Sequence, residues 1–93
     1  DDNKLQTFVD DISDRGGLMI YPNPMKERAT IHFSNPNHEA YQLFLTDLTG
    51  KVMKLIDGIT EESLELSRDD LPSGLYLIEL RGPRIYRGKI VVE

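Results

Sequence analysis

The sequence predicts an all-β protein, an antiparallel Greek-key β-sandwich of about seven strands. Short stretches of alternating or continuous apolar residues fill most of the chain after residue 17, and no helical period lasts longer than one turn. Glycine, proline, asparagine and aspartate interrupt these stretches roughly every ten residues, which is typical of sandwiches and small barrels. The expected strands are residues 18–21, 28–33, 41–46, 51–56, 63–67, 75–80 and 85–92.

Alternation within the strands indicates which side chains form the core. In residues 28–33, one face carries Ala29, Ile31 and Phe33, and the other carries Thr30 and His32. The same period groups two further sets on core faces: Tyr41, Leu43 and Leu45, and Tyr76, Ile78 and Leu80.

The connections carry turn chemistry. Gly50, at the end of Asp47-Leu48-Thr49-Gly50, suits a positive φ. Asp57-Gly58 predicts a further turn after the strand 51–56, and Gly82-Pro83 predicts a tight turn before the last strand.

The pattern Leu71-x-x-Gly74-x-Tyr76 narrows the fold to an immunoglobulin-like sandwich. In such folds a tyrosine near the start of the penultimate strand returns its hydroxyl to the backbone a few residues upstream. Pro72 presets the turn, and Gly74 lets the chain begin the strand at positive φ. The alternative is an ordinary turn followed by a core tyrosine.

Composition excludes several function classes. The chain has 93 residues and a net charge of −5, which argues against a nucleic-acid partner or an anionic membrane. It has no cysteine, so disulfides, thiolate metal sites and a cysteine nucleophile are excluded. No run of about 18 apolar residues is present, so we expect no direct membrane insertion.

Residues 1–17 read as a linker. The apolar patch 5–9 lies in an acidic segment with Asp10, Asp11 and Asp14, and could add an edge strand or a helical turn. Arg15-Gly16-Gly17 supplies a flexible break. Because the chain starts without a methionine or a signal peptide, we expect it to be cut from a longer protein. We also expect the closing strand, which ends at Glu93, to lie at the C-terminus of that protein.

No catalytic, cofactor or metal site is expected. His32 falls on an outward strand face and His38 in a turn, without a nucleophile or carboxylate motif nearby. The serines lack a nucleophile-elbow pattern. Asp69-Asp70 indicates turn chemistry, with a calcium contact as the alternative. We therefore expect no enzyme activity in this chain, although an upstream cargo could be an enzyme.

Several blocks, in order, resemble the type A C-terminal sorting domains of the type IX (Por) secretion system of Bacteroidetes-type bacteria. The resemblance covers residues 18–93, and only the short loop 81–84 departs from the expected pattern. The blocks are Leu18-Met19-Ile20-Tyr21-Pro22-Asn23-Pro24, the strand 41–46, Asp47-Leu48-Thr49-Gly50-Lys51-Val52, Leu71-Pro72-Ser73-Gly74-Leu75-Tyr76-Leu77-Ile78, and Gly88-Lys89-Ile90-Val91-Val92.

The resemblance implies a delivery function. Such domains end a secreted cargo, pass through the periplasm, and are recognised by an outer-membrane translocon. A surface sortase then removes them, often joining the cargo to anionic lipopolysaccharide at the cell surface. Arg15, Gly16 and Gly17 are the candidate cleavage region, because proteolysis concentrates in exposed segments of small residues.

The last strand is the candidate recognition element. A receptor shared by many cargoes can read the backbone of an exposed sheet edge, whatever the side chains. We expect this edge at Lys89, Ile90, Val91, Val92 and Glu93. The motif Tyr21-Pro22-Asn23-Pro24 either sets the geometry with which the chain enters the domain or forms a second contact.

Two alternatives from other classes remain. The first is a small immunoglobulin-like adhesion or carbohydrate-binding module; the chain has no tryptophan, and most of its aromatic residues fall at core positions. The second is an accessory domain that completes the active site of an attached enzyme.

Overall fold

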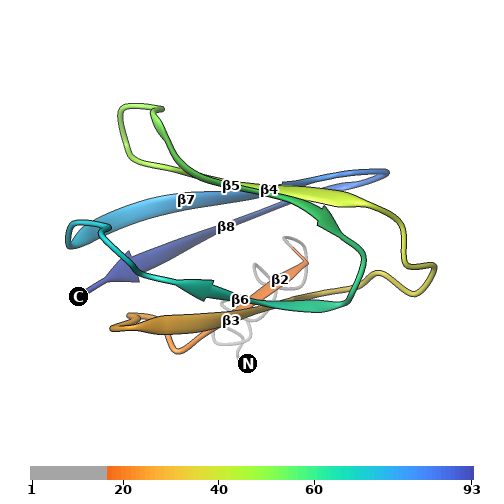
Figure 1. Ribbon diagram of the computed structural model, residues 1–93, viewed down its shortest axis with the longest axis horizontal. Coiled ribbons are helices and arrows are strands. Elements are labelled where there is room, and N and C mark those ends of the chain that lie inside the picture. The colour runs from red at the N-terminus through yellow and green to blue at the C-terminus, as the bar shows by residue number, and fades with distance from the viewer. Residues whose placement is uncertain (1–16) are drawn as a thin grey trace, which may run out of the picture.

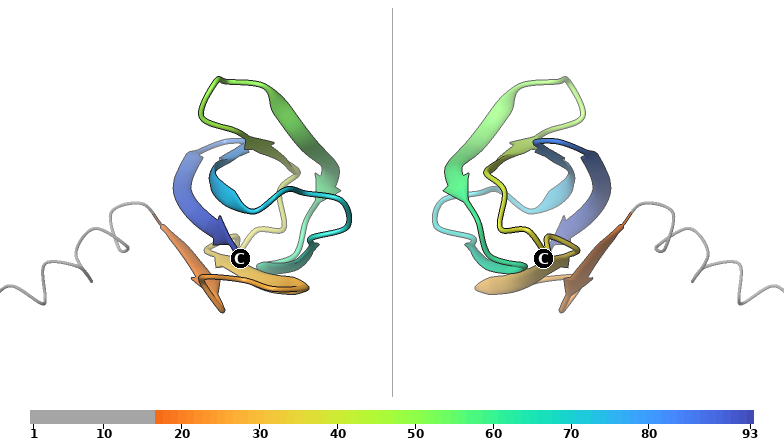
Figure 2. Two further views of the ribbon diagram at one scale, coloured as in Figure 1. Left: turned by 90° about the vertical axis from the view of Figure 1, so that its left-hand side faces the viewer. Right: turned by 90° about the vertical axis from the view of Figure 1, so that its right-hand side faces the viewer.

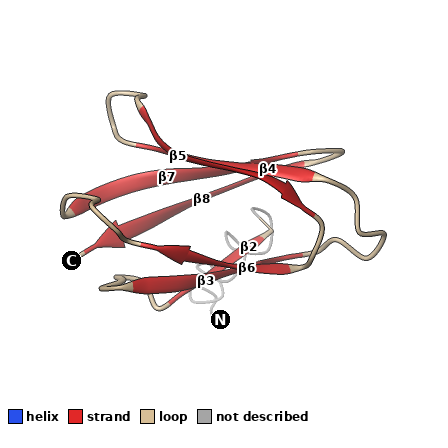
Figure 3. Cartoon of the chain, in the orientation of Figure 1, coloured by secondary structure: helices blue, strands red, loops and turns tan. Residues whose placement is uncertain are grey.

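The computed structural model describes residues 17–93, which form two antiparallel sheets packed face to face (Figure 1). The first sheet has the strand order β2-β3-β6, and the second has the order β5-β4-β7-β8. All regular structure in the described part is strand (Figure 3), so the predicted sandwich is confirmed. The strands are β2 (Leu18–Tyr21), β3 (Arg28–Phe33), β4 (Tyr41–Thr46), β5 (Val52–Ile59), β6 (Ser63–Ser67), β7 (Gly74–Arg81) and β8 (Ile85–Val92).

The chain changes sheets three times in this region. It passes from β3 to β4, returns from β5 to β6, and crosses again from β6 to β7. Viewed end-on, the two sheets enclose a single core, and β8 curves from the four-stranded sheet toward β2 (Figure 2). The first and last described strands therefore lie side by side.

The core is built from the alternating faces that the sequence predicted. Ala29, Ile31 and Phe33 are all buried, as are the two sets grouped on β4 and β7. At one end of the core, the ring of Phe33 lies 5.1 Å from that of Tyr41 and 5.5 Å from that of Tyr86, measured between centroids. Such tilted aromatic packing stabilises the core beyond the area it buries.

The structure corrects the expected turn at Asp57-Gly58. β5 continues through both residues to Ile59, and Gly58 has a φ of 66°. Leu43 pairs with Ile56 whereas Tyr41 pairs with Ile59, so β5 carries one extra residue here. A glycine at positive φ suits a β-bulge as well as a turn, which is why the local pattern was misread.

The predicted tyrosine corner is confirmed. The hydroxyl of Tyr76 donates a hydrogen bond of 2.5 Å to the carbonyl oxygen of Pro72, while its ring is buried. Gly74 begins β7 with a φ of 153°. The corner fixes where β7 starts, and thereby the register of β8 against it.

We expect Tyr76→Phe to lower the free energy of unfolding by about 1 kcal/mol, because the carbonyl of Pro72 loses its partner while the ring keeps its packing. The midpoint of urea denaturation measures this. Tyr21→Phe is the matched control, since the Tyr21 side chain is half exposed. Equal midpoints for Tyr76→Phe and the unchanged protein would contradict the role assigned to the hydroxyl.

Candidate recognition surface around the last strand

β8 is the last strand of the four-stranded sheet, and its residues face two ways. Ile90 and Val92 are buried, whereas Lys89 and Val91 point outward. The five residues predicted for recognition therefore fall into two groups, one facing outward and one facing the core. Lys89, Val91 and Glu93 present side chains to the outside, and the other two belong to the core.

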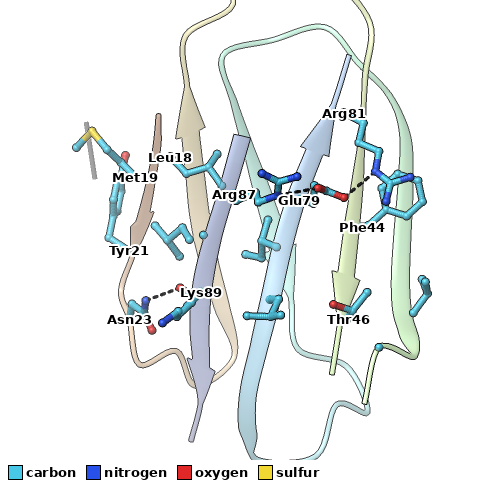
Figure 4. Close-up of a pocket in the computed structure, with 16 residues that line it drawn as sticks. Leu18, Met19, Tyr21, Asn23, Phe44, Thr46, Glu79, Arg81, Arg87 and Lys89 are labelled. Carbon is cyan, nitrogen blue, oxygen red and sulfur yellow. Dashed lines mark hydrogen bonds and ion pairs between the residues drawn. The ribbon is translucent and has the colours of Figure 1, made fainter. Parts of the chain in front are cut away.

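Asn23 joins the opening turn to β8. Its Nδ2 donates a hydrogen bond of 3.0 Å to the carbonyl oxygen of Lys89, and its Oδ1 accepts one of 2.9 Å from the amide of Val91. Figure 4 shows the side chain of Asn23 beside β8 at Lys89. The amide side chain thus pairs with the strand edge as a backbone peptide group would.

Met25 extends this pairing by one further step. Its amide donates to the carbonyl oxygen of Val91 at 2.8 Å, and its carbonyl accepts from the amide of Glu93 at 2.9 Å. Met25 forms a parallel bridge with Val92, and both side chains are buried. We call the contacts of Asn23 and Met25 with β8 the edge clamp.

The edge clamp differs from the open backbone edge expected at this strand. Four backbone groups of residues 89–93 already have partners: the carbonyl of Lys89, both groups of Val91, and the amide of Glu93. A receptor strand could pair with them only by displacing Asn23 and Met25. From the carbonyl of Lys89 to the amide of Glu93, the folded domain therefore offers side chains rather than free backbone groups.

Two glycines of the candidate set allow close packing near the clamp. A Cβ added to Gly88 would lie 3.0 Å from Cδ1 of Ile20 and 3.1 Å from Cδ1 of Leu18. The missing side chain therefore lets β2 lie against β8. A Cβ at Gly17 would lie 2.3 Å from the ring of Tyr86, so Gly17 packs against the folded body. Arg15 and Gly16, with the acidic and apolar residues before them, lie outside the described residues.

Arg68 connects the tyrosine corner to residue 93, a contact that the sequence did not predict. Its guanidinium donates to the carbonyl of Leu71 at 3.0 Å, to the hydroxyl of Ser73 at 3.1 Å and to the carbonyl of Glu93 at 2.5 Å. Nothing in the local sequence distinguishes this arginine from others on the surface. Its planar donor groups allow it to bind three acceptors at once.

Asn35 is the buried polar residue of the described core, and its role was also missed. Its Nδ2 donates to the carbonyls of Glu39 and Thr60, and its Oδ1 accepts from the amide of Glu39. These bonds join the loop before β4 to the loop after β5.

The outward face of the four-stranded sheet carries two cross-strand rows of side chains. One row runs Arg87, Glu79, Phe44 and Leu55; the next runs Lys89, Leu77, Thr46 and Val52. All of these residues except Leu55, together with residues of β2, line a groove of about 900 Å³ (Figure 4).

Glu79 is the charged centre of the first row. Its carboxylate accepts hydrogen bonds from Arg81 at 2.7 Å and from Arg87 at 2.9 Å. The hydrogen bond from Arg81, assisted by that from Arg87 and by both positive charges, lowers the pKa of Glu79 although partial burial opposes it. Arg81 also lies 4.3 Å from the centroid of the Phe44 ring.

Other residues singled out in the sequence have local roles. The carboxylate of Asp47 accepts from the hydroxyl and amide of Thr49 and from the amide of Lys51, which lowers its pKa. Gly50 has the expected positive φ of 93°. Asp69 pairs with Lys54 at 2.5 Å.

The described part of the chain has neither a metal-binding cluster nor a membrane-spanning helix. Within residues 17–93, no group of three or more histidine, cysteine, aspartate or glutamate side chains is arranged to hold a metal ion. The same stretch contains no helix with the length and hydrophobicity needed to cross a membrane.

Comparison with solved structures shows the class of fold. The chain is similar to a DUF3244 family protein with an immunoglobulin-like β-sandwich fold from Bacteroides vulgatus ATCC 8482. The TM-score is 0.67 at 18% sequence identity, and the match covers 86% of this chain and 88% of the other. This likeness establishes an immunoglobulin-like β-sandwich.

Comparison with protein-family models shows the family to which the chain belongs. Residues 19–93 match the model of the secretion system C-terminal sorting domain. The chain belongs to this family, and the resemblance to type IX sorting domains is confirmed. A comparison with curated proteins finds no match.

Removing the edge clamp should weaken the domain at a defined place. We expect Asn23→Ala to lower the free energy of unfolding by about 1–2 kcal/mol, since two hydrogen bonds to β8 are lost. Hydrogen exchange should accelerate at the amide of Val91, whose acceptor is the Asn23 side chain. Asn37→Ala is the control, because that side chain is exposed in a loop. Unchanged exchange at Val91 would show that the clamp does not form.

The pKa of Glu79 predicts an acid-dependent loss of stability. The pKa of Glu79 is lower in the folded than in the unfolded chain. Ionised Glu79 therefore contributes its full stabilisation when the pH is above the usual pKa of this carboxyl, near 4.5. This contribution is lost as the pH falls from that value through the lower pKa of the folded state. The free energy of unfolding should therefore fall more steeply toward acid for the unchanged protein than for Glu79→Gln. Parallel profiles from chemical denaturation would contradict the prediction.

Proposed function

We propose that residues 18–93 direct an attached upstream cargo across the outer membrane through the type IX secretion system. The match of residues 19–93 to the sorting-domain family carries this proposal. The edge clamp supports it, because it joins the family's opening motif at Asn23 to its closing strand at Lys89 and Val91. The first and last sequence blocks of the family resemblance thus form one structural unit.

The proposed recognition element is the last strand in its folded setting. Ile90 and Val92 hold the strand in the core, while Lys89, Val91 and Glu93 present side chains outward. The translocon is the proposed partner, and a surface sortase is proposed to act after it. Tyr21-Pro22-Asn23-Pro24 contributes by closing the domain on this strand.

The cargo is proposed to cross the periplasm before export and to reach the cell surface or medium afterward. Residues 1–17 are proposed as the linker in which the sortase cuts. Gly17 packs against Tyr86, so the cut is proposed to precede it, at Arg15 or Gly16.

Export of a reporter tests the proposal. Residues 1–93 are placed behind a signal peptide and a fluorescent protein in a bacterium with type IX machinery. The full fusion should reach the surface or medium. A fusion lacking Lys89–Glu93 should stay in the periplasm, because it loses core residues and the proposed recognition strand together. A folded full fusion that stays inside would contradict the proposal.

The exported reporter also tests the cleavage region. Mass spectrometry of its C-terminal peptide should place the cut within residues 1–17. Peptides from Tyr41–Leu80 still attached to the surface reporter would show that the domain is not removed.

A further inference from the structure

We propose that the outward face of the four-stranded sheet is a docking surface for an acidic, aliphatic segment of another polypeptide. We call this the outer face. The inference rests on the proposed export function, since it names the surface through which a component of the machinery would hold the domain. The outer face consists of Phe44, Thr46, Val52, Leu55, Leu75, Leu77, Glu79, Arg81, Arg87, Lys89 and Val91.

The outer face exposes several large apolar side chains. Leu77 is 40% exposed at the centre of the outer face, and Val52 and Leu55 on β5 are 49% and 54% exposed. Leu75 and Val91 form a further exposed pair on β7 and β8. The solvent side of an antiparallel sheet is ordinarily polar. Contiguous apolar side chains on such a face mark a site of interaction.

The charged side chains of the outer face are mostly positive. Within the outer face, three cations, Arg81, Arg87 and Lys89, outnumber the carboxylate of Glu79, while the outward side chain of Glu93 lies beyond the end of β8. Glu79 is shared between both arginines, and no ion pair to Lys89 is found among the described residues. The face is therefore positive on a chain whose net charge is −5. Carboxylates on a partner would complement it.

The outer face also forms part of a groove. The groove of about 900 Å³ extends from Met19 and Tyr21 on β2, across β8 and β7, to Val52 on β5. Figure 4 shows Arg87, Glu79, Arg81 and Phe44 in a row across it. A concave surface of this kind fits a polypeptide segment better than a flat bilayer, and the chain's net negative charge opposes an anionic membrane. A second copy would set the same cations against each other.

Export of charge-reversed domains provides the first test. Arg87→Glu combined with Lys89→Glu should reduce export of the reporter fusion about tenfold, and Leu77→Glu should act similarly. The matched control is Arg28→Glu combined with His32→Glu, at exposed outward positions of β3 on the opposite sheet. Its export should equal that of the unchanged fusion. Thermal unfolding of each purified domain establishes that the variants fold.

The outcomes separate this inference from the export function. If the unchanged fusion is not exported, the export function fails. If it is exported and the folded outer-face variants are exported equally well, only the docking surface fails. Equal losses in the outer-face and control variants would also overturn the docking surface, because the effect would then not be specific to one sheet.

Binding to outer membranes isolated from the exporting strain tests the chemistry of the partner. The unchanged domain should bind, binding should weaken at high salt, and protease treatment of the membranes should abolish it. The Arg87→Glu and Lys89→Glu variant should bind about tenfold more weakly. Binding that survives protease would indicate lipid as the occupant and overturn the proposal. Dimerisation of the purified domain through this face would overturn it in favour of a second copy.

Discussion

The structure depends on the pairing of the chain's opening turn with its last strand. β2 belongs to one sheet and β8 to the other, so neither sheet's own ladder holds them together. The side chain of Asn23 and the backbone of Met25 supply four hydrogen bonds across this gap. Each contributes on the order of 1 kcal/mol, a sizeable fraction of the stability of a small domain. Gly88 allows the close approach that these bonds require.

This pairing also determines how the domain can be recognised. Open strand edges invite pairing with other chains, and proteins commonly cover them. Here the edge clamp covers the edge of β8 from the carbonyl of Lys89 to the amide of Glu93, so this part of the strand offers side chains instead of backbone groups. Buried Ile90 and Val92 then have a structural role, and outward Lys89 and Val91 are left for contact. Under the proposed function, recognition through these side chains would let a partner bind the closed sandwich without opening it.

Local sequence patterns predicted much of the fold. Alternation located the core faces of β3, β4 and β7, and turn residues placed most strand ends within one or two residues. The tyrosine corner was predicted in detail because Pro72, Gly74 and Tyr76 are close in sequence and each has a distinct conformational preference. Asp57-Gly58 was misread because a bulge and a turn use the same residues.

The candidate site was less predictable, because its contacts join distant residues. Asn23 lies 66 residues from Lys89, and Arg68 lies 25 residues from Glu93. Periodicity shows which way a side chain points but not which strand edge it meets. The hydrogen bonds of Asn35 were not predicted for the same reason, since two of its partners, Thr60 and Glu62, lie in the distant loop between β5 and β6.

A reversible disulfide across the edge clamp would show whether the domain is recognised while this clamp is closed. Met25 and Val92 are bridge partners with buried side chains, and the chain has no cysteine of its own, so Met25→Cys with Val92→Cys can form a single disulfide there. If the domain is read as a closed sandwich, the oxidised variant should be exported as efficiently as the unchanged fusion. Export of the reduced variant alone, with both forms folded, would show that the clamp must open and that the backbone edge of β8 is what the machinery reads.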